Sequence, residues 1–232
     1  MPLTRLHRSL VCILVITAII AAGLPARAGV TDACHCFRQR DYDPKRPFAA
    51  DDYILTTSFN SLTAAWFGIP KKTLVRYKMK GGIGQVDLMI ALALSRERGI
   101  DPGRALSMRQ KAGDWKKAIT ALPGLKQGKG GDNRIVALLR QKDPAAVARI
   151  LTDEMLAAFY RLPAARIETL RAAGCSEKEI ALLLVLEKEK KIPAAKLLEQ
   201  VRKEGRSWSE IAFCLGITPK EAGRMILNLH DR

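Results

Sequence analysis

Two stretches of the sequence resemble each other, and this internal repeat constrains the fold more than any other feature of the chain. Residues 60–122 align with residues 153–215 with only two one-residue shifts. In both stretches an aromatic pair, a proline, a glycine, a long apolar segment, a second glycine and a tryptophan follow in the same order. A repeat of this kind indicates one supersecondary unit that is used twice. We therefore predict an internal duplication of a four- to five-helix unit.

The segments within each copy have the pattern of helices. Residues 87–98 are apolar on almost every side and end before Gly99, while residues 176–191 begin with a capping box and continue with leucines. A helix that is apolar all round belongs at the centre of a fold. The segments 102–112 and 193–204 begin with proline and end before glycine, as helices often do. Alternating strand patterns are nearly absent, so the predicted fold class is all-α.

The repeat and its flanking segments divide the chain into five parts. Trp115 and Trp208 open short helices at matching places, and we expect each to pack against the central helix of its own copy. A glycine-rich linker and a bridging helix at residues 135–140 lie between the copies. The predicted parts are a signal peptide at 1–28, an irregular arm at 29–50, helical repeat 1 at 51–127, the linker and bridging helix at 128–151, and helical repeat 2 at 152–232.

The first 28 residues have the pattern of a secretory signal peptide. A basic start is followed by an apolar run over residues 10–24, by Pro25, and by the small-x-small cleavage pattern at residues 26–28. Cleavage after Ala28 predicts a periplasmic or secreted protein that is not integral to the membrane. Because the uncharged run is just long enough to span a bilayer, an inner-membrane anchor is one alternative. A lipoprotein acylated at Cys34 is the other.

The chain is strongly basic, with 39 lysines and arginines against 23 acids and a net charge of +16. Removal of residues 1–28 takes away three arginines and no acid, so the mature chain stays basic. Outside the inner membrane the abundant polyanions are lipid headgroups, lipopolysaccharide and anionic cell-wall polymers. The charge therefore predicts either a well-solvated surface or one that binds an anionic cell-envelope polymer.

The most unusual local sequence is Cys34-His35-Cys36. Two thiolates and an imidazole suit a soft or borderline metal, although the segment offers no fourth ligand. A Cys34–Cys36 bond would close a small strained ring, which is typical of redox-active disulfides. A structural disulfide is the third interpretation, because an oxidising compartment favours disulfides. The four cysteines of the mature chain, Cys34, Cys36, Cys175 and Cys214, allow three connectivities. Cys214 stands in an apolar run, so we expect it to be buried.

Residues 207–228 resemble the helix-turn-helix of bacterial sigma factors and response regulators. Ala212 is small where two helices would approach, Gly216 suits the turn, and Thr218 suits the cap of the second helix. The resemblance implies that the second helix enters the major groove with its exposed side chains, here Lys220, Glu221 and Arg224. The export signal and the lack of a second helix at the matching place in repeat 1 count against DNA. Nucleic-acid binding is therefore the alternative function.

Residues 34–122 are similar to a group of uncharacterised exported bacterial proteins. These begin with Cys-His-Cys-Phe and a charged stretch just after the signal. A Tyr-x-Leu-x-Thr-x-x-Asn-Ser-like helix follows, here at residues 53–61. The resemblance implies that the Cys-His-Cys-Phe element is a shared feature, and it implies no activity.

No catalytic constellation is evident, so we predict a protein that is not an enzyme, and nothing in the sequence requires a cofactor. The paired acids Asp41/Asp43, Asp51/Asp52 and Asp153/Glu154 read as helix-start charges or solvated loop residues. Tyr53, Asn60 and Trp66 suit core packing, with a shared cleft as the alternative. The predicted function is that of an exported non-catalytic helical protein that binds a protein partner or an anionic surface. A redox or metal role centred on Cys34-His35-Cys36 is a further alternative.

Overall fold

The computed structural model describes residues 37–121 and 134–230, and within these residues the fold is all-α, as the sequence predicts. Twelve helices and no strand are present in this part of the chain. The helices are α2 (Asp51–Phe67), α3 (Lys71–Gly81), α4 (Gln85–Arg98), α5 (Pro102–Ala112), α6 (Trp115–Ala121), α7 (Arg134–Gln141), α8 (Pro144–Tyr160), α9 (Ala164–Ala172), α10 (Glu177–Lys190), α11 (Ala194–Arg202), α12 (Trp208–Cys214) and α13 (Pro219–His230).

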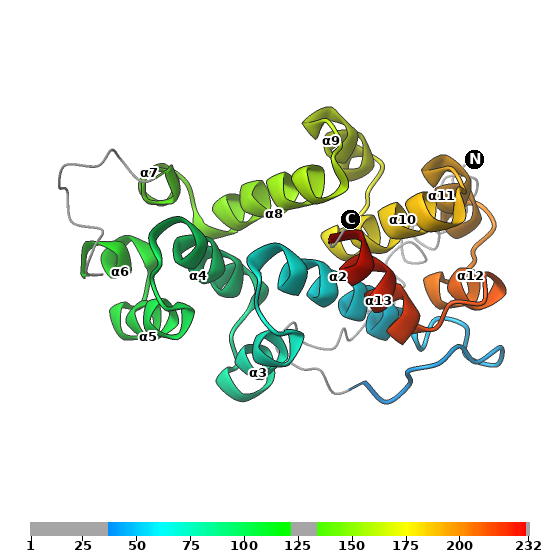
Figure 1. Cartoon of the computed structure of the whole chain (residues 1–232), viewed down its shortest axis with the longest axis horizontal. Helices are drawn as coiled ribbons and strands as arrows, with labels where there is room; N and C mark the ends of the chain where they lie inside the picture. The colour runs from blue at the N-terminus through cyan, green and yellow to red at the C-terminus, as the bar shows by residue number, and fades with distance from the viewer. Residues whose placement is uncertain (1–36, 122–133, 231–232) are drawn as a thin grey trace, which may run out of the picture.

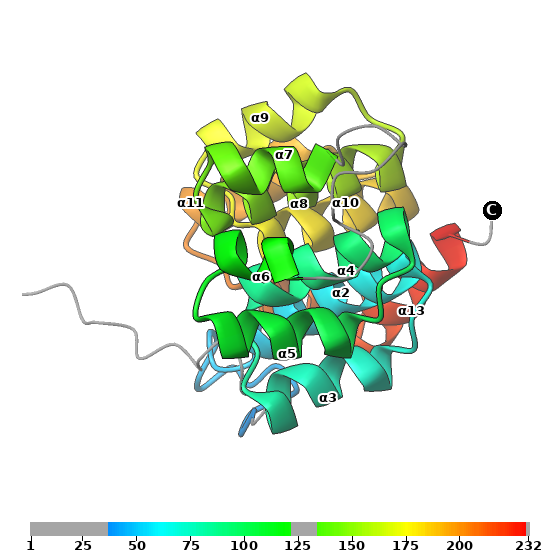
Figure 2. The ribbon, with the colours of Figure 1, turned by 90° about the vertical axis from the view of Figure 1, so that its left-hand side faces the viewer.

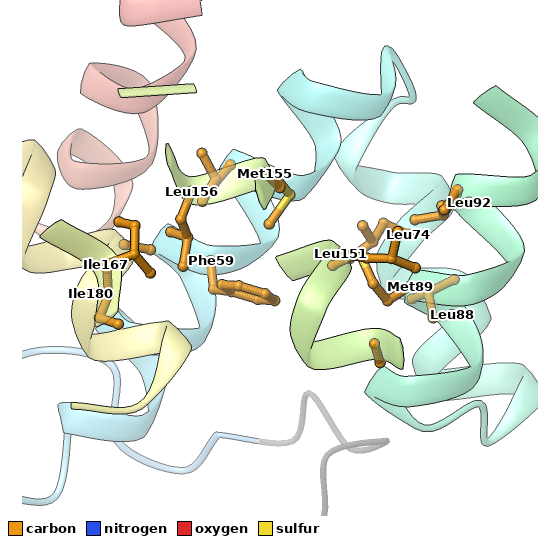
Figure 3. Packing of buried hydrophobic residues seen from close by; sticks show 14 of the residues in the cluster. Phe59, Leu74, Leu88, Met89, Leu92, Leu151, Met155, Leu156, Ile167 and Ile180 are labelled. Carbon is orange, nitrogen blue, oxygen red and sulfur yellow. The ribbon is translucent and has the colours of Figure 1, made fainter. Parts of the chain in front are cut away.

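Four helices, α2, α4, α8 and α10, form the centre of the molecule (Figure 1). Helix α2 packs against α10, and α4 packs against α8, so each half of the chain buries its apolar helix against the other half. The apolar residues 88–94 and 180–186 are buried on all sides, which matches the prediction of central helices. Figure 3 shows Leu151 of α8 beside Met89 of α4 within this core. One hydrophobic cluster therefore joins both halves.

The remaining helices surround this centre (Figure 2). Helices α5 and α6 follow α4, α3 lies against α2, and α9 lies against α8. Helix α13, the last helix of the described residues, packs along α2 and α10. None of the helices in the described residues is both long enough and apolar enough to cross a bilayer.

Helices in both halves of the chain end with residues in the left-handed conformation. Seven glycines have positive φ, and Arg161 and Lys191 are the only other described residues that do. Left-handed residues commonly end helices, and glycine is the usual choice because it has no Cβ. The positive-φ residues at or shortly after helix ends are Gly68, Gly82, Gly99 and Gly113 in the first half, and Arg161, Gly174, Lys191, Gly205 and Gly216 in the second.

Helix α8 crosses the boundary that the sequence placed between the linker at 128–151 and repeat 2 at 152–232. The Asp143 side chain accepts a hydrogen bond from the backbone N–H of Ala146 and starts this helix, which continues without a break to Tyr160. The predicted bridging helix is present as α7, and the glycine-rich linker itself lies outside the described residues.

The arm ahead of α2 contains turns and no helix in its described part, residues 37–50. Its side chains contact both α2 and α12. The Tyr42 ring lies 5.1 Å from that of Phe213, and Phe37 lies edge-on to Tyr53. The Ser209 hydroxyl donates to the Pro47 carbonyl at 3.0 Å. The arm therefore bridges α2 and α12.

Candidate functional site

Helix α3, at the surface of the molecule, is strongly basic. Its sequence holds five lysines and arginines and no acid. No acid occurs anywhere between Asp52 and Asp87. The helix lies at one edge of the molecule, where it packs on α2 (Figure 2).

Two of the five cations point inward, onto a polar face of α2. The Lys71 amine donates to the Thr57 carbonyl at 3.1 Å and to the Ser61 hydroxyl at 2.8 Å. The Lys78 amine donates to Asn60 Oδ1 at 3.1 Å, and its side chain is only 3% exposed. Asn60 and Ser61 belong to the motif at residues 53–61, so in this structure that motif holds the lysines of α3.

Helix α13 closes over the Lys71 amine. A Cβ atom at Gly223 would lie 2.8 Å from Ser61 Oγ and 3.5 Å from Lys71 Nζ, so α13 approaches α2 more closely than a side chain would allow. The resulting burial lowers the pKa of the Lys71 amine to about 8, because desolvation disfavours the charged form.

The inward lysines fix which side of α3 faces solvent. Lys71, Leu74 and Lys78 occupy the inner face, and Leu74 is buried. Residues three and four positions apart share a helix face, so Lys72, Arg76 and Met79 occupy the outer one. All three are exposed, and Met79 keeps 49% of its surface accessible. We call these three residues the α3 strip.

Helix α13 carries a second strip of the same kind. Lys220 and Arg224, which the sequence singled out, are both exposed, and Leu227 on the same face is 39% exposed. The opposite face buries Ala222 and Ile226 against α2 and α10. Arg224 lies 3.6 Å from the Glu221 carboxylate, which also caps the helix. We call Lys220, Arg224 and Leu227 the α13 strip.

The α12–α13 hairpin has the turn that the sequence indicated, with Gly216 at a φ of 68° and Ala212 buried beneath it. An acid from the other end of the chain anchors the hairpin. The Asp51 carboxylate accepts hydrogen bonds from the Ser209 hydroxyl at 2.7 Å and from the Ser209 N–H at 2.9 Å. Asp51 and Asp52 lie in the first turn of α2, in agreement with their interpretation as helix-start charges, but the cap residue is Ala50 and the Asp51 carboxylate turns toward α12.

The cysteines separate into two groups. Cys34, His35 and Cys36 lie outside the described residues. Cys175 is buried, which raises the pKa of its thiol. Cys214 is exposed, contrary to the sequence prediction, because it ends α12 on the side away from the core, where Arg206 donates to its sulfur at 3.1 Å. Within the described residues no group of three or more His, Cys, Asp or Glu side chains is placed to hold a metal ion.

The acids near α8 differ from the prediction. Asp153 and Glu154 lie well inside the helix rather than at its start. The Arg171 guanidinium donates to Asp153 at 2.7 Å, and the Arg134 guanidinium donates to both oxygens of Glu154 at 2.7 Å. These ion pairs tie α8 to α9 and α7, so both acids serve the packing of helices.

Tyr53, Asn60 and Trp66 do not line a common cleft. Asn60 faces α3, Tyr53 contacts Phe37 of the arm, and Trp66 lies beneath the Arg96 guanidinium, whose carbon is 3.9 Å from the ring centroid.

A pocket of about 670 Å³ lies where the N-terminal end of α2 meets α10, α11 and α12. Most of its charged groups are engaged within the fold, while Asp52 is exposed at its edge. Glu179 accepts from the Trp208 indole at 3.0 Å and from Arg202 at 3.0 Å. Glu179 and Arg202 therefore link α10 to α11 at this pocket.

Sequence reasoning singled out Lys220 and Arg224 but missed Lys72 and Arg76. The signal for the second pair is the acid-free segment Lys71-Lys72-Thr73-Leu74-Val75-Arg76-Tyr77-Lys78, whose helical period places 72 and 76 on one face. Comparison of the chain with protein-family models, with curated proteins and with solved structures found no match.

Proposed function

We propose that this chain is an exported, non-catalytic helical protein that binds an anionic surface through Lys72 and Arg76, the two cations of the α3 strip. The observation that carries this proposal is the state of Lys72 and Arg76. Both are exposed, and neither forms an ion pair with any acid in the described part of the chain. A cation without an acid partner keeps its field available to an approaching anion.

Several arginines elsewhere in the described residues pair with acids of the fold, and their contrast with Lys72 and Arg76 supports the proposal. Helix α9 packs on α8 as α3 packs on α2, yet Arg166 of α9 pairs with Glu187 at 3.2 Å and Arg171 pairs with Asp153. Further pairs involve Arg109 with Asp87, Arg134 with Glu154, Arg202 with Glu179, and Arg206 with Glu210.

We also infer that the two halves arose by duplication, and a repeated contact supports this. In each half a buried indole N–H and a guanidinium meet a carboxylate at the third residue of the central helix. The indole bonds measure 2.7 Å and 3.0 Å, and the arginine contacts 3.3 Å and 3.0 Å. The residues are Trp115, Asp87 and Arg109 in the first half, and Trp208, Glu179 and Arg202 in the second.

Helix lengths and helix ends support the same inference. Helices α2 and α8 both have 17 residues, α4 and α10 both have 14, and α6 and α12 both have 7. The two positive-φ residues that are not glycine, Arg161 and Lys191, fall where the first half has Gly68 and Gly99. If the chain is duplicated, the acid-free segment around α3 distinguishes the first copy from the second, whose helix α9 contains Glu168.

Nucleic-acid binding through the α12–α13 hairpin is the second candidate function. The observation in its favour is that Lys220 and Arg224 lie on the exposed face of the second helix, as a recognition helix requires. The Glu221 carboxylate beside Arg224 would repel a phosphate at the same face.

The experiment compares two double variants in binding to heparin, a soluble polyanion. Lys72→Ala with Arg76→Ala removes the unpaired cations of α3. Lys116→Ala with Lys196→Ala is the matched control, because it removes two exposed cations from α6 and α11. We expect the α3 variant to bind heparin several-fold more weakly than the control, with a shallower dependence on salt. Equal affinities would contradict the proposal, and sequence-selective duplex binding at about 150 mM salt would favour the nucleic-acid alternative.

A further inference from the structure

We propose that the anionic partner is a lipid bilayer, and that Met79 and Leu227 enter its interface while the neighbouring cations hold headgroup phosphates. This inference rests on the proposed function above and names the partner class of the same site. It draws on both the α3 strip and the α13 strip.

The two strips share one pattern. Lys72, Arg76 and Met79 stand at positions i, i+4 and i+7 of α3, and Lys220, Arg224 and Leu227 stand at the same spacing in α13. This spacing puts all three side chains on a single helix face. Each strip therefore presents two cations followed by one exposed apolar side chain.

The helices that carry the strips are neighbours. Both pack on α2, and the backbone of Gly223 in α13 approaches the Lys71 amine of α3. In Figure 2, α3 lies along the lower margin of the molecule and α13 lies at its right-hand side. Within the described residues only four large apolar side chains are exposed, and two of them belong to these strips. A third, Phe213, precedes α13 on α12.

The apolar side chains favour a bilayer over a polyanion in water. A soluble polyanion takes up cations and offers nothing to an exposed methionine or leucine. A membrane interface takes up both, because apolar residues enter the headgroup–acyl boundary while lysines and arginines stay at the phosphates. Glu221 lies on the α13 face and pairs with Arg224, so the α3 strip is expected to contribute more of the binding.

The test measures co-sedimentation with vesicles of phosphatidylcholine alone and of phosphatidylcholine with roughly one-third phosphatidylglycerol. The protein is purified from the cell fraction where it accumulates, and mass spectrometry identifies its N-terminus. Vesicles of phosphatidylcholine alone report any insertion by the N-terminal segment, which all variants share. Met79→Ser with Leu227→Ser removes the apolar contacts, and Phe48→Ser removes an exposed apolar side chain of the arm as the matched control.

We expect binding to the anionic vesicles only, and an approximately tenfold loss of that binding in the Met79→Ser, Leu227→Ser variant, with heparin affinity unchanged. Phe48→Ser should bind as the parent does. Circular dichroism and the thermal midpoint establish that each variant is folded. The Lys72→Ala, Arg76→Ala variant should bind both vesicles and heparin several-fold more weakly than the parent.

The failures are distinguishable. Unchanged vesicle binding in the Met79→Ser, Leu227→Ser variant overturns the bilayer inference and leaves the proposed function standing. Strong heparin binding by the parent without any vesicle binding has the same meaning. Unchanged vesicle and heparin binding in the Lys72→Ala, Arg76→Ala variant overturns the proposed function itself.

Discussion

At the scale of the residue, burial changes the chemistry of Lys71. Its amine contacts a carbonyl and a hydroxyl and no acid, and desolvation lowers its pKa from 10.5 to about 8. The folded state therefore binds fewer protons than the unfolded state between these values, so stability rises with pH through this window. Below about pH 8 the charged amine destabilises the fold in full.

Lys71→Met removes this charge and keeps most of the side-chain volume. We expect it to raise the free energy of unfolding at pH 7 by about 1–2 kcal/mol, a value reduced for solvent screening, and to have a smaller effect at pH 10. Denaturant unfolding at the two pH values measures the difference. Lys72→Met on the exposed face is the control and should have little effect at either pH. An equal gain at both pH values for Lys71→Met would contradict the role of desolvation.

Trp208 is a buried anchor whose indole bonds to Glu179. We expect Trp208→Ala to cost about 3–5 kcal/mol in the free energy of unfolding, the usual cost of truncating a large core residue. Cys214→Ala, a change at an exposed position of the same helix, should cost less than about 0.5 kcal/mol. A cost below about 1 kcal/mol for Trp208→Ala would mean that the side chain does not support the core.

At the scale of the element, Asp51 joins the first helix of the described fold to the C-terminal hairpin. Its carboxylate accepts from the backbone and side chain of Ser209, 158 residues later in the chain. Asp51→Asn removes the charge from this acceptor, and we expect a cost of about 1–3 kcal/mol. Amide hydrogen exchange in α12 should become faster because the helix start loses its anchor.

Asp52→Asn is the matched control, since Asp52 is exposed at the neighbouring position. It should change neither the stability nor the exchange in α12. Similar effects of the two variants would indicate that the charge near the start of α2 matters, and not the bond to Ser209.

At the scale of the whole molecule, the N-terminal pattern predicts export. Residues 1–28 lie outside the described fold, and their sequence places the cleavage site after Ala28. Mass spectrometry of the protein from a fractionated culture should find Gly29 as its first residue, in the periplasm or the medium. An intact Met1 or a lipid on Cys34 would contradict this prediction and support one of the anchored alternatives.

The fold class and several helix ends follow from the sequence because their causes are local. The predicted segment 102–112 is α5 without change, and the capping box at Ser176 opens α10. Capping, proline at the helix start and glycine at its end act over a few residues, so they are visible in a single sequence. The central place of α4 and α10 also follows, because apolar residues on every side leave no other position.

The tertiary structure alone decides which side chains remain free to bind. The sequence shows the cations of α3 but not that α2 takes up Lys71 and Lys78 and leaves Lys72 and Arg76 exposed. The hydrogen bond between Asp51 and Ser209 and the exposure of Cys214 could not be predicted from the sequence either. Partners that meet only after the chain has folded are far apart in the sequence, and no local pattern records them.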